Sequence, residues 1–225
     1  IETIGAGVTK YSDINKRIRS QKGADANVDY LLKKLIDLEI VEKKVPINEK
    51  GNRKKTFYVF SDNLMQFYYQ FVFPFKNMNS ILSVEDFFAE FVQEKLNARY
   101  LPQMFEKVTR EYLIRANRKH LISPMIYEIG TYSYDDPHQR INRQFDVVTR
   151  DRNGYISYEC KYTAKSVSLS VYREEEFQTR NCGLPFYDLG FASKSGFDPE
   201  LTAHCSHLIT LEEMYADQME TAHHS

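Results

Sequence analysis

The sequence predicts an α/β protein in two parts: a helical N-terminal module with a basic hairpin, and a larger domain of strands enclosed by helices. Three observations carry this prediction. Apolar residues recur with helical spacing before residue 40, two short strand patterns flank a basic loop at 48–55, and apolar strand-like runs begin at about residue 124. The chain of 225 residues is long enough for two ordinary domains.

The first 60 residues read as two helices followed by two strands. Ser12 is a candidate N-cap for a short helix over 13–20, and a second helix is expected over about 26–39. Two helices followed by a basic hairpin form the winged-helix plan, in which the second helix enters the DNA major groove and the wing touches backbone phosphates. The apolar stripe of the second helix has the spacing i, i+3, i+4, i+7, i+8: Val28, Leu31, Leu32, Leu35 and Ile36.

Basic and polar side chains of this module are candidate DNA contacts. Residues 1–60 hold 13 Lys and Arg against 8 Asp and Glu, a net charge of +5, whereas the remainder holds 17 against 23, a net charge of −6. A winged helix used only for protein contact, with a solvated basic wing, is the alternative. The candidate DNA-binding residues lie on the second helix and in the wing: Asn27, Tyr30, Lys34, Lys50, Arg53, Lys54 and Lys55.

Residues 61–99 read as a helical connector. Ser61 or Asp62 can cap its first helix, and Ser83 with Asp86 resembles a capping box for a later one. Six aromatic residues lie between positions 67 and 75. They are expected to form core rather than a base-stacking platform, because clustered aromatics bury large apolar areas.

The most informative stretch is 144–162, which reads as two strands joined by a tight turn over Asp151-Arg152-Asn153-Gly154. With that turn, Arg150 pairs with Tyr155, so Asp146 lies opposite Glu159, and Lys161 shares the face of Glu159. The high apolar content of both strands predicts central positions in a sheet. The opposite, apolar face is expected to hold Phe145, Val147, Tyr158, Cys160 and Tyr162.

Two carboxylates and an ammonium group at one point suit a specific chemistry. Carboxylate oxygens are preferred ligands of Mg²⁺, and a lysine beside the metal can orient or deprotonate a water molecule. The arrangement is that of a metal-dependent phosphodiesterase, with Asp146, Glu159 and Lys161 as catalytic candidates. A solvated charge cluster at a sheet edge is the alternative.

Cysteine usage and hydropathy set further bounds. The chain has three cysteines, none in a C-x-x-C pair or with zinc-ligand spacing, which favours a reducing compartment and a cytoplasmic location. No signal peptide or membrane-spanning run is apparent, so no membrane partner is expected. The chain does not begin with Met, and we expect an upstream portion.

The order of motifs resembles the C-terminal part of archaeal-type P-loop ATPases of the AAA+/STAND-like class, which carry an appended domain of unknown function. The motifs are the winged-helix stretch ending in IVEKKVPINEKGNRKKTFYVFSDNLMQFYYQFVFP, then FEKVTREYL, YDDPHQRINRQFDVV, YECKY and LGFASKSGFD. Together they cover most of the chain. The resemblance implies an ATPase domain upstream as a partner. Because this chain contains no Walker A pattern, it has no ATP site of its own.

In that family the C-terminal domain is similar to the PD-(D/E)xK, or restriction-endonuclease-like, nucleases, which have an α/β/α fold. The resemblance implies that Glu106, Asp146 and Glu159 ligate Mg²⁺, that Lys161 supports the attacking water, and that Gln178 is the later helical Gln. Gln144 replaces an acidic residue common in the family, and it is expected to point to the opposite face. Thr131 and Ser133 stand where the family is expected to have an Arg and a Trp for substrate contacts.

These observations predict four segments and three functions. The segments are a winged-helix domain at 1–60, the connector at 61–99, a nuclease-like domain at 100–217 and a disordered tail at 218–225. The first function is a DNA-binding, Mg²⁺-dependent endonuclease module of an ATPase. The second is a catalytically inactive regulatory or protein-interaction module of the ATPase. A small-phosphoester hydrolase is the third.

Overall fold

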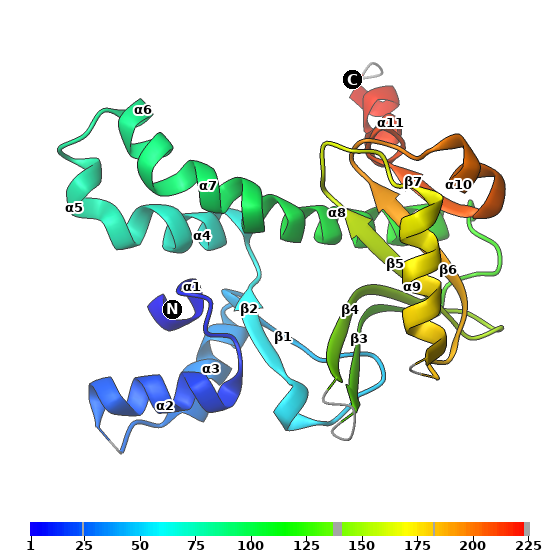
Figure 1. Ribbon diagram of the computed structural model, residues 1–225. Helices are drawn as coiled ribbons and strands as arrows, with labels where there is room; N and C mark the ends of the chain where they lie inside the picture. The colour runs from blue at the N-terminus through cyan, green and yellow to red at the C-terminus, as the bar shows by residue number, and fades with distance from the viewer. Residues whose placement is uncertain (24, 137–140, 182, 223–225) are drawn as a thin grey trace. The chain divides into compact units, whose positions relative to one another are not determined.

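A computed structural model describes residues 1–23, 25–136, 141–181 and 183–222 (Figure 1). The chain divides into two compact units, Ile1–Leu96 and Asn97–Ser225. The fold is mixed α/β, as the sequence predicts. Part of the motif YDDPHQRINRQFDVV, Cys182 and the last three positions of the expected tail lie outside the described residues.

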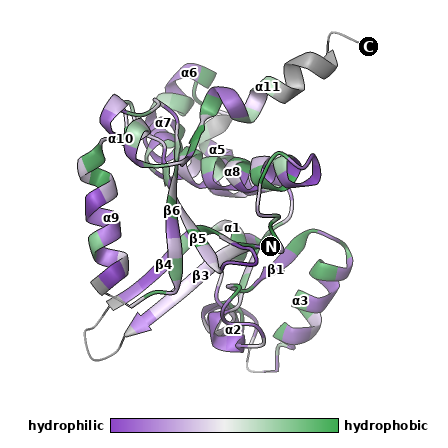
Figure 2. Cartoon of the chain, turned by 90° about the vertical axis from the view of Figure 1, so that its right-hand side faces the viewer, coloured by the Kyte–Doolittle hydropathy of each residue, from purple (hydrophilic) through white to green (hydrophobic). Residues whose placement is uncertain are grey.

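The N-terminal unit begins with helices and a two-stranded antiparallel sheet in which Val41 pairs with Phe60. Apolar faces of the helices and strands meet in one core, and α3 shows the required division into a hydrophobic and a hydrophilic face (Figure 2). The buried core residues are Ile4, Ile14, Val28, Leu32, Val41 and Phe60. The elements are α1 (Glu2–Gly5), α2 (Tyr11–Lys22), α3 (Val28–Asp37), β1 (Val41–Lys44), a 3₁₀ turn (Arg53–Lys55) and β2 (Phe57–Phe60).

Two details of these helices differ from expectation. Helix α2 begins at Tyr11 with Lys10 at its N-cap, and the Ser12 hydroxyl donates to Asp13 Oδ1 at 3.2 Å inside the helix, so the Ser12 cap was wrong. Leu31 is 37% exposed, although it belongs to the expected apolar stripe. The stripe that is buried is therefore narrower than the sequence pattern indicates.

Short helical segments complete the N-terminal unit. Asp62 caps the first of them by accepting from the Met65 N–H at 2.7 Å, and Ser83 caps another by accepting from Asp86 N–H at 3.1 Å, which confirms both predicted caps. Tyr69 stacks on Phe60 with ring centroids 5.5 Å apart, so the aromatic run packs against the hairpin. The segments are α4 (Asn63–Phe67), π-helical Tyr68–Val72, 3₁₀ Phe73–Phe75, α5 (Lys76–Asn79), α6 (Val84–Phe87), π-helical Phe88–Val92 and α7 (Gln93–Lys95), followed by π-helical Leu96–Tyr100.

The C-terminal unit is built on a five-stranded sheet in the order β3-β4-β5-β6-β7. The first three strands are antiparallel and the last three run parallel, so β4 and β5 are internal strands, as predicted. Its elements are α8 (Leu101–Arg118), β3 (Glu128–Asp136), β4 (Ile141–Arg150), β5 (Tyr155–Lys161), α9 (Leu169–Asn181), β6 (Phe186–Ser193), α10 (Pro199–His204), β7 (His207–Thr210) and α11 (Leu211–Ala222).

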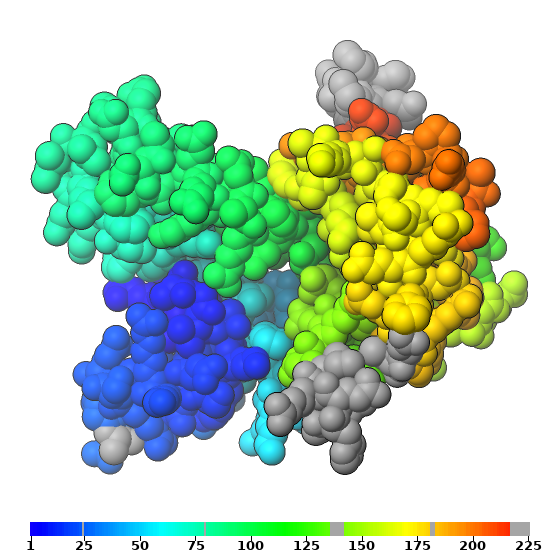
Figure 3. All heavy atoms as spheres, viewed as in Figure 1, coloured from blue at the N-terminus to red at the C-terminus, as the bar shows by residue number. Residues whose placement is uncertain are grey.

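Helices cover both faces of this sheet. Helix α8 lies against one face and α9 against the other (Figures 1 and 2), and α9 covers much of the visible face of this unit in Figure 3. On the α8 face, Phe105 and Leu113 pack with Val147 and Tyr158, while on the α9 face Tyr172 packs against Phe191. Within the described ranges, no helix is both long and apolar enough to cross a membrane.

Candidate functional site

The turn between β4 and β5 has the predicted form. Asp151 N–H donates to the Gly154 carbonyl at 2.9 Å, and Asp151 Oδ1 accepts from the Asn153 N–H at 2.7 Å. Gly154 has a φ of 139°, a conformation that favours glycine. Arg150 pairs with Tyr155, which confirms the predicted register at the turn.

A β-bulge in β4 changes the geometry at the other end of the hairpin. Gly130 of β3 pairs with Val148, and Tyr132 pairs with Phe145, so two steps on β3 match three on β4. Directly opposed residues share a face, so Phe145 shares the face of Val148, and its predicted place beside Val147 was wrong. Pairing between β4 and β5 ends at Val147–Tyr158, one step short of the expected Asp146–Glu159 pair.

Asp146 lies at this bulge and is held by Gln144. Gln144 Nε2 donates to Asp146 Oδ1 at 2.9 Å. The expectation that Gln144 points to the opposite face was therefore wrong, because strand residues two apart share a face. Gln144 thus fixes one oxygen of a candidate ligand.

Glu106 on α8 shares an electrostatic environment with the strand carboxylates. Burial first, and then repulsion from Asp146 and Glu159, raise the pKa of Glu106 to about 8, against the pull of Arg110. Burial also raises the pKa of Asp146, partly opposed by the Gln144 hydrogen bond, with Glu159 adding repulsion. The three acids predicted as one site therefore interact with one another.

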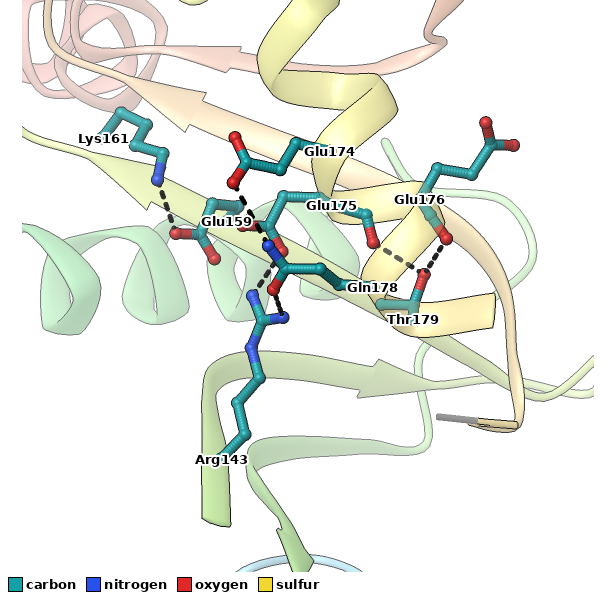
Figure 4. Close-up of polar contacts among 8 residues, drawn as sticks. All are labelled: Arg143, Glu159, Lys161, Glu174, Glu175, Glu176, Gln178 and Thr179. Atoms are coloured by element: carbon teal, nitrogen blue, oxygen red, sulfur yellow. Dashed lines mark hydrogen bonds and ion pairs between the residues drawn. The ribbon is translucent and has the colours of Figure 1, made fainter. Parts of the chain in front are cut away.

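Glu159 and Lys161 lie on β5 and form an ion pair, with Lys161 Nζ 2.8 Å from Glu159 Oε1 (Figure 4). Both side chains are about one-third exposed, at 31% and 32%. They share a face, as strand alternation predicts. In this state the lysine neutralises Glu159.

Arg143 is a member of the site that sequence reasoning missed. Its Nη1 donates to Gln178 Oε1 and its Nη2 to Glu175 Oε2, so it joins β4 to α9 (Figure 4). Burial first, and then Glu159, raise the pKa of Glu175, against the effect of Arg143. One signal was available for its partner Glu175: this residue is three positions before the predicted Gln178, so the two share a helix face.

The carboxylates of the candidate site suit a hard cation, but as they lie here they do not form a complete metal-binding site. Carboxylate oxygens are the ligands Mg²⁺ prefers. In the part of the chain that the structure describes, no three His, Cys, Asp or Glu side chains are grouped so that they could hold a metal ion. Metal binding here would require Glu159 to leave Lys161 and Glu106 to lose a proton.

The predicted DNA-binding residues of the N-terminal unit are mostly at the surface. Tyr30 is 59% exposed, and with Lys33, Lys34 and Asp37 it lines a shallow hollow on α3. Asn27 has a structural task as well, because its side chain caps α3 by accepting from Tyr30 N–H at 3.0 Å. In the loop between β1 and β2, the residues Lys50, Arg53 and Lys54 are exposed and Lys55 is half-buried.

The 3₁₀ turn Arg53–Lys55 gives the predicted wing a defined shape. The Asn52 side chain accepts from Lys54 N–H at 3.0 Å and donates to Glu49 Oε2 at 2.8 Å. These bonds order the loop backbone that carries the basic side chains. The loop therefore presents its cations from a fixed backbone.

Comparison with known proteins links the chain to proteins of unknown function. Residues 68–175 match DUF234, a family described as archaeal and bacterial proteins of unknown function. An uncharacterized protein of Methanocaldococcus jannaschii, MJECL04, is 33% identical over 169 residues, which are 72% of this chain. The chain spans 35% of the length of that relative.

Two solved structures show weak similarity. A protein of unknown function, AF1548, matches with a TM-score of 0.30 and 13% identity, covering 49% of this chain and 66% of that one. VC1899 from Vibrio cholerae matches with a TM-score of 0.36 and 13% identity, covering 93% of this chain and 48% of that one. At these scores the similarity adds nothing to the functional argument.

Proposed function

The chain carries a DUF234 domain, and from that premise we propose that it is the DNA-binding and nuclease-like module of a larger protein. In this proposal the C-terminal unit is a restriction-endonuclease-like domain that cleaves DNA phosphodiesters with Mg²⁺. The N-terminal unit is a winged helix that docks DNA. The partner of this module is an ATPase domain of the same protein, a proposal that rests on the sequence resemblance alone.

One observation carries the proposal: Glu159, which pairs with Lys161 on an internal strand, lies in electrostatic reach of two further half-buried acids, Glu106 and Asp146. Charges on an internal strand are costly unless they are paired or bind a metal. Asp146, Glu159 and Glu106 supply oxygen ligands of the right chemistry. The site also holds the lysine that phosphodiester hydrolysis can use.

Each side chain has a distinct task in the proposed reaction. Glu106, Asp146 and Glu159 would hold Mg²⁺, which when bound neutralises charge that develops on the phosphodiester. Lys161, once released from Glu159, orients the attacking water and stabilises its deprotonated form. Gln144 fixes Asp146 through its 2.9 Å hydrogen bond. Gln178 on α9 accepts a hydrogen bond from Arg143 and so helps to hold that arginine in place.

The proposed DNA-docking role of the N-terminal unit depends on its surface charge. Lys50, Arg53 and Lys54 are exposed in the loop that corresponds to a wing, and Tyr30 and Lys34 are exposed on the second long helix. Backbone phosphates attract such cations without regard to base sequence. This support is electrostatic and specifies no base preference.

A second candidate is a catalytically inactive interaction module, and one observation favours it. Two cations near the site already have partners: Lys161 pairs with Glu159, and Arg143 with Glu175. A site that neutralises itself can be a structural network without any metal. In that case the C-terminal unit would bind a protein partner.

Metal binding and plasmid nicking separate the two candidates. The first measurement is calorimetric titration of the chain with Mg²⁺ and Mn²⁺. The second is nicking of supercoiled plasmid by wild type, Lys161→Ala and Asp146→Ala. We expect wild type to nick, Lys161→Ala to bind metal without efficient nicking, and Asp146→Ala to lose both.

The controls cover contamination and the larger protein. Equal nicking by all three proteins would point to a contaminating nuclease. If the full-length protein with ATP neither nicks plasmid nor binds metal at millimolar concentration, the nuclease proposal fails and the interaction module is favoured. Metal binding without nicking by the full-length protein would reject cleavage alone.

A further inference from the structure

We propose that Arg143 is a contact for a phosphate of the nucleic-acid backbone, and that the Glu175 carboxylate occupies the phosphate position in the free protein. The inference rests on the proposed function, since it names the substrate group that the same site receives. It also assigns a role to two residues that the nuclease-like motif does not include. Figure 4 shows Arg143 reaching from β4 toward α9.

The contacts of the guanidinium match those that a phosphate would make. Its two terminal nitrogens donate to two different oxygen acceptors, Glu175 Oε2 and Gln178 Oε1. A planar fork with two parallel donors is the arrangement by which arginine binds two oxygens of a carboxylate or phosphate. A phosphate oxygen could therefore replace the Glu175 carboxylate without any change in the Arg143 side chain.

The guanidinium is held in place before any ligand arrives. It lies over the Phe145 ring, with its central carbon 4.8 Å from the ring centroid. Phe145 is buried and contacts the rings of Tyr132 and Phe186 at 6.4 and 5.0 Å, so the aromatic support is itself fixed. The Arg143 side chain is still 24% exposed, which leaves an edge open to solvent.

Glu175 is suited to be displaced. It belongs to the acidic run Glu174–Glu176, and Glu159 repels it from the neighbouring strand. A phosphate taking its place would preserve the charge balance of Arg143 and would meet a second cation, because Lys161 also interacts with Glu175. Gln178 has a further partner in Glu174, whose Oε1 accepts from Gln178 Nε2 at 3.3 Å. Release of Glu175 therefore leaves Gln178 anchored.

The test is binding of a fluorescein-labelled short DNA duplex to the full chain in EDTA, where no metal-dependent cleavage occurs. Glu175→Gln keeps an oxygen acceptor for Arg143 but removes the competing charge. Glu176→Gln is the matched control, because it removes the same charge one residue away, where Glu176 pairs with Arg180 instead. We expect Glu175→Gln to tighten binding about fivefold, as for an added charge-assisted contact, and Glu176→Gln to change it less than about twofold.

The Arg143→Gln variant completes a double-mutant cycle. We expect it to weaken binding and to abolish the gain from Glu175→Gln. An equal gain from both glutamate variants, or a gain that survives Arg143→Gln, would show a general charge effect and overturn the proposal. Lower thermal stability with unchanged affinity in all variants would show a structural strut between β4 and α9, which also overturns it.

The design keeps this inference separate from the cleavage proposal. Binding in EDTA requires neither metal nor catalysis. If the variants show the expected DNA affinities but the chain never nicks plasmid, the phosphate contact is retained and the nuclease proposal is rejected. If wild type nicks plasmid but Arg143→Gln leaves the DNA affinity unchanged, the nuclease proposal is retained and the phosphate contact is rejected.

Discussion

The two units place their basic side chains in different surroundings. In the N-terminal unit, Arg53 and Lys54 are exposed on an ordered loop. In the C-terminal unit, Arg143 and Lys161 are partly buried, at 24% and 31% exposure, and each pairs with a glutamate. The first arrangement suits diffuse attraction to phosphates, and the second suits recognition at one point.

This difference shows why net charge is a poor guide to the C-terminal unit. Its acidic excess argues against broad phosphate binding, yet a single oriented arginine does not depend on net charge. Exposed pairs contribute little to stability, whereas partly buried pairs strongly constrain geometry. The comparison can be tested by disturbing each unit in turn.

The largest expected effect comes from Asp146→Asn in the C-terminal unit. The substitution keeps the shape of the side chain and its contact with Gln144 but removes a ligand charge, so nicking and Mg²⁺ affinity should each fall at least about 100-fold. Plasmid nicking and calorimetry measure the two losses. Glu200→Gln, an exposed acid outside the site, is the control. Unchanged metal affinity in Asp146→Asn would contradict the ligand assignment.

The next effect concerns the wing. Replacing Lys50, Arg53, Lys54 and Lys55 by Ala should weaken duplex binding about tenfold or more at moderate salt and lower the slope of log K against log salt by about 0.9 per lost phosphate contact. Fluorescence anisotropy at several salt concentrations gives the slope. The matched control replaces four exposed basic residues of the other unit: Arg152, Lys165, Arg173 and Arg180. Equal slopes for both variants would remove the distinction between the units.

A smaller effect is the pH dependence contributed by Glu106. Its pKa is about 8 in the folded chain against an ordinary value of 4.5, because burial and neighbouring acids disfavour the charge. The folded state therefore holds the proton more tightly than the unfolded state, and stability falls as pH rises through this window, by up to about 1.4 kcal/mol per pH unit. Glu106→Gln should flatten that part of the curve. Denaturant unfolding from pH 5 to pH 9 measures it, and parallel curves for both proteins would contradict the shift.

The smallest expected effect concerns the Asn52 side chain that orders the wing. Asn52→Ala removes the hydrogen bonds to Lys54 N–H and Glu49 and should cost roughly 0.5–2 kcal/mol, as for other capping side chains. Duplex affinity should fall about twofold to threefold, because a looser loop pays more entropy on binding. Asn77→Ala, at an exposed asparagine outside the loop, is the control. A fall in stability without any change in affinity would show that loop order does not matter for DNA.

Much of the fold follows from local patterns in the sequence. Helical spacing located α3, and alternating spacing located the hairpin of β4 and β5 with its turn, since these depend on neighbours close in the chain. Helix α10, only six residues long, was not predicted, because a segment of that length carries too little periodicity. The cap of α2 was also misplaced, because Ser12 hydrogen-bonds within the helix instead.

The sequence predicted which residues belong to the site better than it predicted how they are arranged. Glu106, Asp146 and Glu159 interact, but the bulge in β4 shifted Phe145 to the other face and ended the pairing before Asp146. A bulge depends on the partner strand, and single-strand alternation cannot reveal it. Arg143 was missed because its partners lie 32 and 35 residues further along the chain, where no local pattern indicates a contact.

The extra residue in β4 also has a consequence for insertion and deletion. Because Phe145 and Val148 already share a face, removing Asp146 or Val147 would restore regular pairing with β3 without exchanging the faces of the residues on either side. A residue inserted or removed at a regularly paired position of β4 would, in contrast, exchange the faces of every residue on one side of the change. The spacing of the chain, and not only the identity of its residues, therefore encodes this site, and a length change of one residue should be more damaging in the regularly paired part of β4 than at the bulge.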